Sequence, residues 1–181
     1  MDESFYTEQF ELRALSPTVW VLTARRLKRC ADIIFNKYKI DLAALESGAS
    51  PLDLQNLELS GCATLLQGFA FENLLKAIVI QAQPTVIVGG RLRKWSADGH
   101  DLLALCAEAS LDISEAERDL FARLTAFVRW AGRYPIPKSV QDMKLSQAAG
   151  PTGWVPLPLN SVELVEIDTL YERLETMVIQ E

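Results

Sequence analysis

The segment LELSGCATLLQGFAFENLLKAIVIQAQ, residues 57–83, decides the fold of this 181-residue chain. Its apolar residues recur at intervals of three and four along two neighbouring lines, which predicts a long helix that is buried on more than one side. Gly61 and Gly68 lie seven residues apart and therefore share a face of this helix. Because glycine costs a helix up to about 1 kcal/mol at each position, we expect a neighbouring helix backbone to approach closely there.

Four further helices are predicted from capping residues and apolar stripes. Their expected ranges are 17–39, 100–110, 114–131 and 161–181. Ser16 and Pro17 suit the start of the first, and the spacing of Ser114 and Glu117 forms a capping box that starts the third. Between the helices, the β-branched stretch TVIVGG (85–90) favours a short extended segment, for which the sequence offers no obvious partner strand.

These patterns predict an all-α fold, an up-and-down bundle of about five helices that forms a single domain. The expected parts are an acidic lead-in at 1–16, a bundle core at 17–137, a proline-rich loop at 138–160 and a C-terminal helix at 161–181. The lead-in is expected to pack loosely or to fray. Because plain connections are rarely so long, the proline-rich stretch 133–160 is a candidate docking surface for a partner.

The net charge of −6 hides a segregation of acids and bases along the chain. Residues 25–39 carry six bases and one acid, whereas residues 163–181 carry six acids and one base. We expect the basic helix to face an acidic helix or water. An isoelectric point near 4.9 argues against a broad positive surface for nucleic acid, although a local basic patch can still bind an anion.

The composition favours a cytoplasmic globular protein. With 49% hydrophobic residues the chain is too apolar for disorder. No apolar run approaches the roughly 20 residues of a membrane-spanning helix, and no signal-peptide pattern is present. We therefore expect no membrane contact.

The cysteines and the single histidine give no metal-binding pattern. Cys30, Cys62 and Cys106 are far apart and fall on apolar helix positions, so we expect them to be reduced and buried. Since there is no Cys-x-x-Cys pair, no metal site is predicted. The absence of a phosphate-loop motif likewise leads us to expect no cofactor.

Glu72 and Lys76 are the first candidate functional pair. They lie four residues apart, in the favourable order, on the most apolar helix. At that place they are expected to be partly buried and to need partners. They form either a structural polar network or the floor of a pocket.

His100 is the second candidate. Histidine is the side chain that most readily exchanges a proton near neutral pH, and this chain has one. Asp101 could orient the imidazole while Arg93 holds a phosphate and His100 moves a proton, which is the minimum chemistry for RNA cleavage by a 2′-hydroxyl. The alternative interpretation is that His100, with Asp98 or Asp101, only caps the helix that follows.

Three segments in this order resemble the HEPN-domain superfamily. They are GFAFENLLKAIVI (68–80), GHDLLALCAEASL (99–111) and SEAERDLFARLTAFVRWAGRYPIP (114–137). The branch that they resemble contains uncharacterised bacterial proteins with Gly-His-Asp-Leu before one helix and Arg-Tyr-Pro after the next. The resemblance covers about 68–137.

The resemblance implies an all-α bundle that commonly forms homodimers. It also implies a role in prokaryotic defence, toxin–antitoxin pairs, RNA cleavage, or nucleotide and nucleic-acid binding. Ribonuclease members carry an arginine followed, after four to six residues, by a histidine. Here six residues separate Arg93 from His100.

The leading hypothesis is a HEPN-like, homodimeric binding or interaction module for a nucleotide, RNA or a partner protein. The residues expected to bind the ligand are Glu72, Lys76, Arg91, Lys94, Arg133 and Tyr134. The alternative is a metal-independent endoribonuclease in which Arg93, His100 and Asp101 are catalytic. Dimerisation would then bring two such sets into one cleft.

Overall fold

The computed structural model describes residues 3–48, 55–142, 159 and 161–179. Its α-helices are α1 (Glu3–Ala14), α2 (Pro17–Glu46), α3 (Ser60–Ala82), α4 (Leu102–Glu108), α5 (Glu115–Ala126) and α7 (Ser161–Ile179). A 3-10 helix, η2 (Gln55–Leu59), precedes α3, and a π-helix, η3 (Phe127–Ala131), continues α5. The remaining elements are the two-residue strands β1 (Ile87–Val88) and β2 (Arg91–Leu92). The predicted all-α fold is confirmed.

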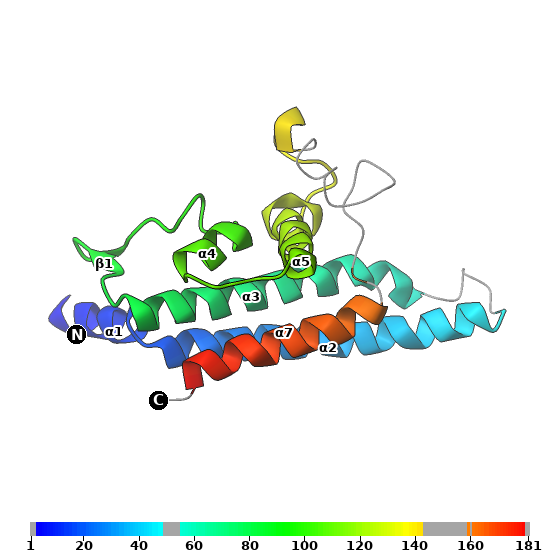
Figure 1. The fold of residues 1–181 in the computed structure, drawn as a ribbon, viewed down its shortest axis with the longest axis horizontal. Helices are drawn as coiled ribbons and strands as arrows, with labels where there is room; N and C mark the ends of the chain where they lie inside the picture. Colours follow the sequence, from blue (N-terminus) through cyan, green and yellow to red (C-terminus); the bar gives the residue numbers. More distant parts are fainter. Residues whose placement is uncertain (1–2, 49–54, 143–158, 160, 180–181) are drawn as a thin grey trace.

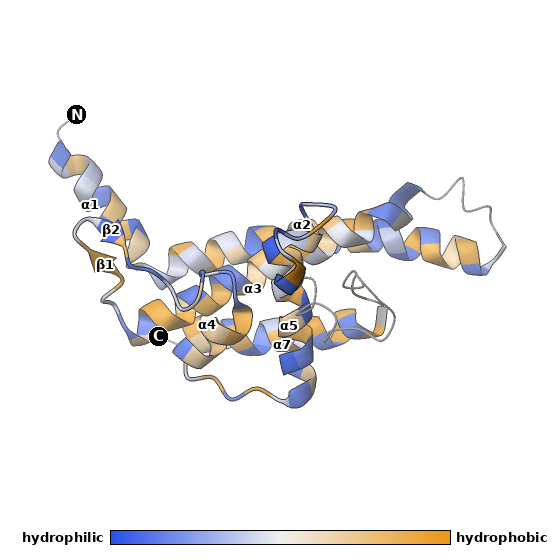
Figure 2. Ribbon diagram, turned by 90° about the horizontal axis from the view of Figure 1, so that it is seen from above, coloured by the Kyte–Doolittle hydropathy of each residue, from blue (hydrophilic) through white to orange (hydrophobic). Residues whose placement is uncertain are grey.

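The helices are arranged around α3 (Figure 1). The long helices α2, α3 and α7 lie side by side, whereas α4 and α5 lie on the opposite side of α3 from α2. Helix α5 is seen end-on in Figure 1 and lengthwise in Figure 2, so it crosses α3 instead of running beside it. As the sequence predicts, α3 is buried on more than one side.

Aromatic contacts hold α3 between its neighbours. The Phe71 ring is fully buried and packs edge-to-face on Phe121 of α5 and on Tyr171 of α7, with ring centroids 5.3 and 5.6 Å apart. Such aromatic pairs add about 0.5–1.5 kcal/mol beyond the burial of their area.

Helix α3 is long enough, and on average apolar enough, to cross a membrane, although charged residues interrupt its sequence. However, 78% of that stretch is buried inside the protein, as in a core helix.

Gly68 lies where another helix backbone comes close. A Cβ atom at Gly68 would lie 2.5 Å from Cγ2 of Val128 and 3.3 Å from the carbonyl oxygen of Leu124. At Gly61 the only atom within 4 Å is Cε1 of Phe127, at 3.9 Å, which is ordinary contact. The expected close approach is therefore confirmed at Gly68 and wrong at Gly61, because the crossing helix passes over only one of the two positions.

Ion pairs join the basic helix α2 to the acidic helix α7. Arg25 Nε lies 2.8 Å from Glu175 Oε1, and Lys28 Nζ lies 2.6 Å from Asp168 Oδ1. The expectation that the basic helix faces an acidic one is confirmed for these residues. Other bases of the same run, such as Arg29, are exposed.

Two sequence predictions are wrong in local detail. Cys30 and Cys62 are exposed, and only Cys106 is buried. In α2 the core position is occupied by the neighbouring Ala31, which turns Cys30 outward. The extended stretch at 85–90 does have a partner, because Val88 pairs with Arg91 in an antiparallel hairpin.

The structure describes most of the predicted acidic lead-in but only part of the predicted proline-rich loop. The acidic lead-in forms the helix α1, of which only Ala14 is buried. It lies at one end of α2 and extends away from the other helices (Figure 2). Most of the predicted proline-rich loop, residues 143–158, lies outside the described residues.

Candidate functional site

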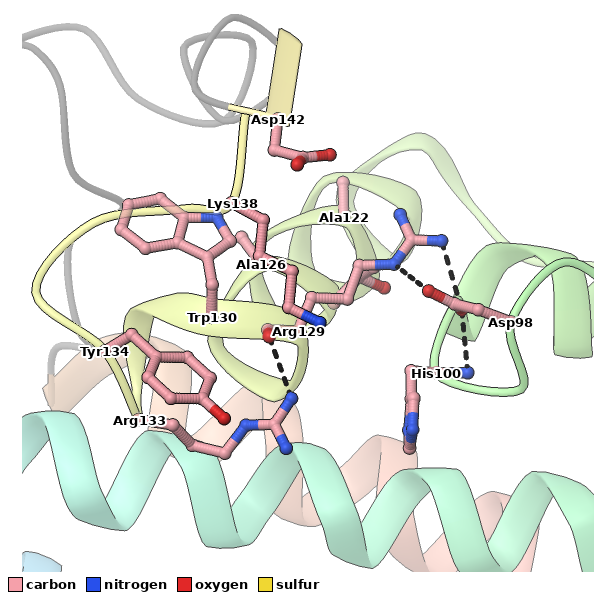
Figure 3. Close-up of a pocket in the computed structure, with 11 residues that line it drawn as sticks. Asp98, His100, Ala122, Ala126, Arg129, Trp130, Arg133, Tyr134, Lys138 and Asp142 are labelled. Carbon is pink, nitrogen blue, oxygen red and sulfur yellow. Dashed lines mark hydrogen bonds and ion pairs between the residues drawn. The ribbon is translucent and has the colours of Figure 1, made fainter. Parts of the chain in front are cut away.

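A cavity of about 550 Å³ lies between the loop before α4 and the end of α5 (Figure 3). Its lining residues are Asp98, His100, Ala122, Thr125, Ala126, Arg129, Trp130, Arg133, Tyr134, Lys138 and Asp142. The volume falls in the usual range of small-molecule sites, about 300–1,000 Å³. Charged side chains and aromatic rings share its wall, so it can hold a ligand that is both charged and flat.

The π-helix η3 forms one wall of the cavity. The amide of Gly132 donates to the carbonyl oxygen of Phe127 at 3.1 Å, which is the five-residue spacing of a π-helix. A Cβ atom at Gly132 would lie 2.6 Å from Cβ of Leu65 on α3, so the chain can pass there only as glycine. The widened turn carries Arg129 and Trp130 to the cavity, and π-helical turns often occur at functional sites.

A tight turn forms the opposite wall. Gly99 is buried with φ of 74°, a left-handed conformation that favours glycine, and it packs against the Trp95 ring. The Asp98 carboxylate accepts a hydrogen bond from the His100 amide at 3.0 Å. Asp101 caps α4 by accepting from the Ala104 amide at 3.1 Å, as the sequence predicts for one of the two aspartates.

Arg129 joins the two walls. Its Nε and Nη2 atoms donate to both oxygens of Asp98, at 2.9 and 3.1 Å, and Nη2 also lies 3.4 Å from Asp101. Burial opposes ionisation of Asp98, but the hydrogen bonds from Arg129 and from the His100 amide outweigh it and lower the pKa of Asp98. The charge of Arg129 is thus largely satisfied within the protein.

Glu72 and Lys76 form a buried ion pair behind His100. Lys76 Nζ lies 2.7 Å from Glu72 Oε1, and Nδ1 of His100 lies 2.9 Å from Glu72 Oε2. The two α3 residues are 6% and 7% exposed, and the Lys76 ammonium also lies 5.4 Å from the centre of the Trp95 ring. The predicted polar network is therefore present. Neither Glu72 nor Lys76, both predicted to bind the ligand, lines the cavity, and the network reaches the cavity through His100.

Arg93 does not line the cavity. Its guanidinium pairs with Glu108 and stacks 5.4 Å from the Trp95 ring, while the second oxygen of Glu108 accepts from the Ser96 amide. Arg93 therefore holds the hairpin segment to α4. The predicted pairing of Arg93 with His100 in one groove is not found within a single chain.

The other two bases of that segment are also absent from the cavity. Arg91 is exposed on β2, and Lys94 is exposed in the connection that follows. By contrast, the predicted residues Arg133 and Tyr134 both line it. Arg133 donates to the Arg129 carbonyl oxygen at 2.8 Å, and its guanidinium lies 5.5 Å from the Tyr134 ring.

Sequence reasoning missed Arg129 and Lys138. A usable signal was available for Arg129, because it lies four residues before Arg133 and next to Trp130, so both arginines reach one side of a helix end. Lys138 gave no such signal, since it lies in an irregular segment whose path the sequence pattern does not indicate.

Comparison with protein-family models, with curated proteins and with solved structures gives no match for this chain. Among residues 3–48, 55–142, 159 and 161–179, no group of three or more histidine, cysteine or acidic side chains is placed to hold a metal ion. The candidate function therefore depends on the cavity and its surroundings.

Proposed function

We propose that this chain is a HEPN-like binding module whose cavity takes an anionic ligand with an aromatic ring, a nucleotide or one nucleotide unit of RNA. The observation that carries the proposal is the meeting of all three segments that resemble the HEPN superfamily. Glu72 of the first segment contacts His100 of the second, and His100 shares the cavity with Arg133 and Tyr134 of the third.

The charges around the cavity favour a ligand with a single anionic group. Three cations, Arg129, Arg133 and Lys138, face two carboxylates, Asp98 and Asp142. In the described part of the chain no carboxylate pairs with Arg133 or Lys138, whereas Arg129 is held by Asp98. These two unpaired cations are placed to bind a phosphate. The nearby carboxylates limit the attraction for a long polyanion.

The aromatic ring of Tyr134 favours a ligand that carries a nucleobase or another flat group. The residue is 50% exposed, and its ring stands at the edge of the cavity beside Arg133 (Figure 3). Stacking of a nucleobase on an exposed aromatic side chain contributes about 1–3 kcal/mol. A phosphate on Arg133 and a base on Tyr134 together make a nucleotide-sized ligand.

Calorimetric titration of the purified protein with adenosine monophosphate, adenosine and inorganic phosphate tests the proposal. We expect the monophosphate to bind more tightly than either part. Replacing Arg133 and Lys138 together by alanine should weaken its binding at least about tenfold, because a hydrogen bond to a charged group contributes about 1.5–3 kcal/mol. The control replaces Arg26 and Arg29, two exposed bases of α2 that lie off the cavity. Equal binding by both double variants, or none of any probe, contradicts the proposal.

A metal-independent endoribonuclease is the second candidate. It is favoured by the contact between His100 and the buried carboxylate of Glu72, an arrangement suited to a residue that moves a proton. The cation beside His100 in the cavity is Arg129 or Arg133, since Arg93 pairs with Glu108. Cleavage of single-stranded RNA should be lost in His100→Ala and kept in Arg93→Ala. Loss in Arg93→Ala alone would instead favour the pair predicted from the sequence.

We also propose that the chain forms a homodimer, as the resemblance implies. Exposed apolar side chains on the outer face of α2, at Val19, Leu22, Ile33 and Ile40, support an interface of some kind. Light scattering should give twice the chain mass at micromolar concentration. A monomer at every concentration tested contradicts this part of the proposal.

A further inference from the structure

The structure assigns Glu72 as the residue that fixes which nitrogen of His100 carries the proton, so that the other nitrogen is left as the hydrogen-bonding atom offered to a ligand. The part of this inference that concerns a ligand rests on the function proposed above. The part that concerns His100 itself does not, because it follows from contacts within the chain.

The Glu72 carboxyl group is held in a buried ion pair. Its side chain is 8% exposed, and Oε1 lies 2.7 Å from the ammonium of Lys76. A carboxyl group that pairs with a buried ammonium is ionised, and an ionised carboxylate has acceptor oxygens and no donor. The second oxygen, Oε2, is therefore an acceptor toward whatever approaches it.

The nitrogen of His100 that approaches Oε2 is Nδ1. Nδ1 lies 2.9 Å from that oxygen, a normal hydrogen-bond distance. Because the oxygen only accepts, Nδ1 must carry a proton and donate it, in the neutral ring and in the imidazolium alike. The tautomer of the neutral ring is thereby set by Glu72, in the same way that a buried carboxylate sets the tautomer of a catalytic histidine.

Nε2 is the other ring nitrogen of His100. No described residue makes a hydrogen bond to Nε2 of His100, although the side chain is 41% exposed and lines the cavity. Because the proton of the neutral ring is on Nδ1, Nε2 is left as an acceptor. The charged groups that surround the imidazole are Glu72 and Lys76 on α3, Asp98 and Asp101 in its own loop, Arg129 on η3 and Arg133 just after it.

The positions of His100 and Arg133 restrict the class of ligand that the cavity favours. In Figure 3 the imidazole of His100 and the guanidinium of Arg133 lie on the same side of the cavity, next to α3. A ligand held there by Arg133 through an anionic group is favoured if it also presents a hydroxyl or amino donor to Nε2. Glu72 acts through His100 and is a positioning residue.

Nitrogen-15 NMR of the whole labelled protein tests the assignment directly. The chain has one histidine, so its ring signals need no assignment by mutation. At alkaline pH, where the ring is neutral, we expect a protonated Nδ1 and an unprotonated Nε2, the reverse of the tautomer that free histidine prefers. A wild-type spectrum with the proton on Nε2 overturns the inference.

Glu72→Gln should shift the equilibrium toward the proton on Nε2, because an amide can donate as well as accept. Glu108→Gln is the matched control, since Glu108 binds Arg93 and the Ser96 amide and has no hydrogen bond or ion pair with His100. An unchanged tautomer in a folded Glu72→Gln protein overturns the inference. If that variant does not fold, the wild-type spectrum at alkaline pH still decides, because a proton on Nε2 there overturns the inference.

Binding measurements separate this inference from the proposed function. In the wild-type protein, phosphoethanolamine, whose ammonium group only donates, should bind several times more tightly than ethyl phosphate, which has no such donor. Glu72→Gln should reduce that ratio toward one, and an unchanged ratio overturns the claim about the ligand. If neither compound binds while Nδ1 carries the proton, the proposed function and the ligand claim fail and the assignment of Glu72 stands.

Discussion

Glu72 Oε2 and His100 Nδ1 lie 2.9 Å apart and join the most buried helix to the loop that opens α4. The contact bridges 28 residues of sequence and places a buried charge next to a cavity. Because Glu72 also holds Lys76, one carboxylate serves both the core and the cavity wall. The stability of α3 and the geometry of His100 are therefore coupled.

The first prediction concerns this buried pair. Lys76→Ala leaves the carboxylate of Glu72 buried with only His100 as a partner, so the free energy of unfolding should fall by about 3 kcal/mol or more. Urea denaturation followed by circular dichroism measures the change. The midpoint should move to lower urea with little change in slope.

The matched variant replaces both charges by apolar residues of similar size, Glu72→Leu with Lys76→Met. Because no buried charge is then left unpaired, this double variant should be more stable than Lys76→Ala alone. A double variant that is less stable than the single one by the full cost of a second independent mutation contradicts the coupling of the two side chains.

The second prediction compares two glycines on one helix face. Alanine improves helix propensity at both sites by up to about 1 kcal/mol. At Gly68, however, the new Cβ would lie 2.5 Å from Val128, and such overpacking costs about 1–3 kcal/mol. We expect Gly68→Ala to lower the thermal midpoint and Gly61→Ala to leave it unchanged or raise it. Equal shifts in the same direction would show that close packing is not what requires Gly68.

The sequence predicted the helices well because their signals are local. Apolar spacing placed α3, and the capping box of Ser114 and Glu117 placed the start of α5 within one residue. Whether an individual side chain is buried or exposed was harder to predict from the sequence. Cys30 lies beside the apolar stripe of α2, and only the packing of Ala31 on the core decides that the thiol points outward.

The sequence predicted a contact of the candidate site between residues close together in the chain and missed a contact between distant residues. Glu72 and Lys76 are four apart, so their pairing follows from helix geometry. Arg129 meets Asp98 across 31 residues, a contact between η3 and the loop before α4 that no local sequence pattern indicates. Arg93 precedes His100 closely in sequence, yet the β-hairpin directs it to Glu108.

The third prediction concerns acid pH. Burial opposes ionisation of Glu108, but hydrogen bonds from Ser96 and Arg93 outweigh it, so the pKa of Glu108 is lowered from 4.5, as that of Asp98 is lowered from 3.8. A group with a lowered pKa in the folded state stabilises the fold above its ordinary pKa and loses that contribution as the pH falls below it. The thermal midpoint should therefore drop as the pH falls from about 5 toward about 2.

Glu108→Gln and Asp98→Asn should each make that drop shallower, because the amide cannot bind the proton. The control is Asp119→Asn on the exposed side of α5, since Asp119 makes no ion pair with any described residue. A pH profile that keeps its full slope in the Glu108→Gln and Asp98→Asn double variant would show that other carboxylates dominate the acid transition.

The fourth prediction concerns the three thiols. Burial raises the pKa of Cys106 from 9.0 to about 12, helped by the negative charge of Glu117, whereas Cys30 and Cys62 are exposed. Because the thiolate is the reactive form, Cys106 should be inert at neutral pH in the folded protein. Iodoacetamide should add two groups to the native chain and a third only after unfolding in urea, as counted by intact-mass spectrometry. Cys62→Ser should lower the native count to one. Three additions at one common rate would mean that Cys106 is as accessible to the reagent as the two exposed thiols. That result contradicts the packing of α4 against α3 and α5.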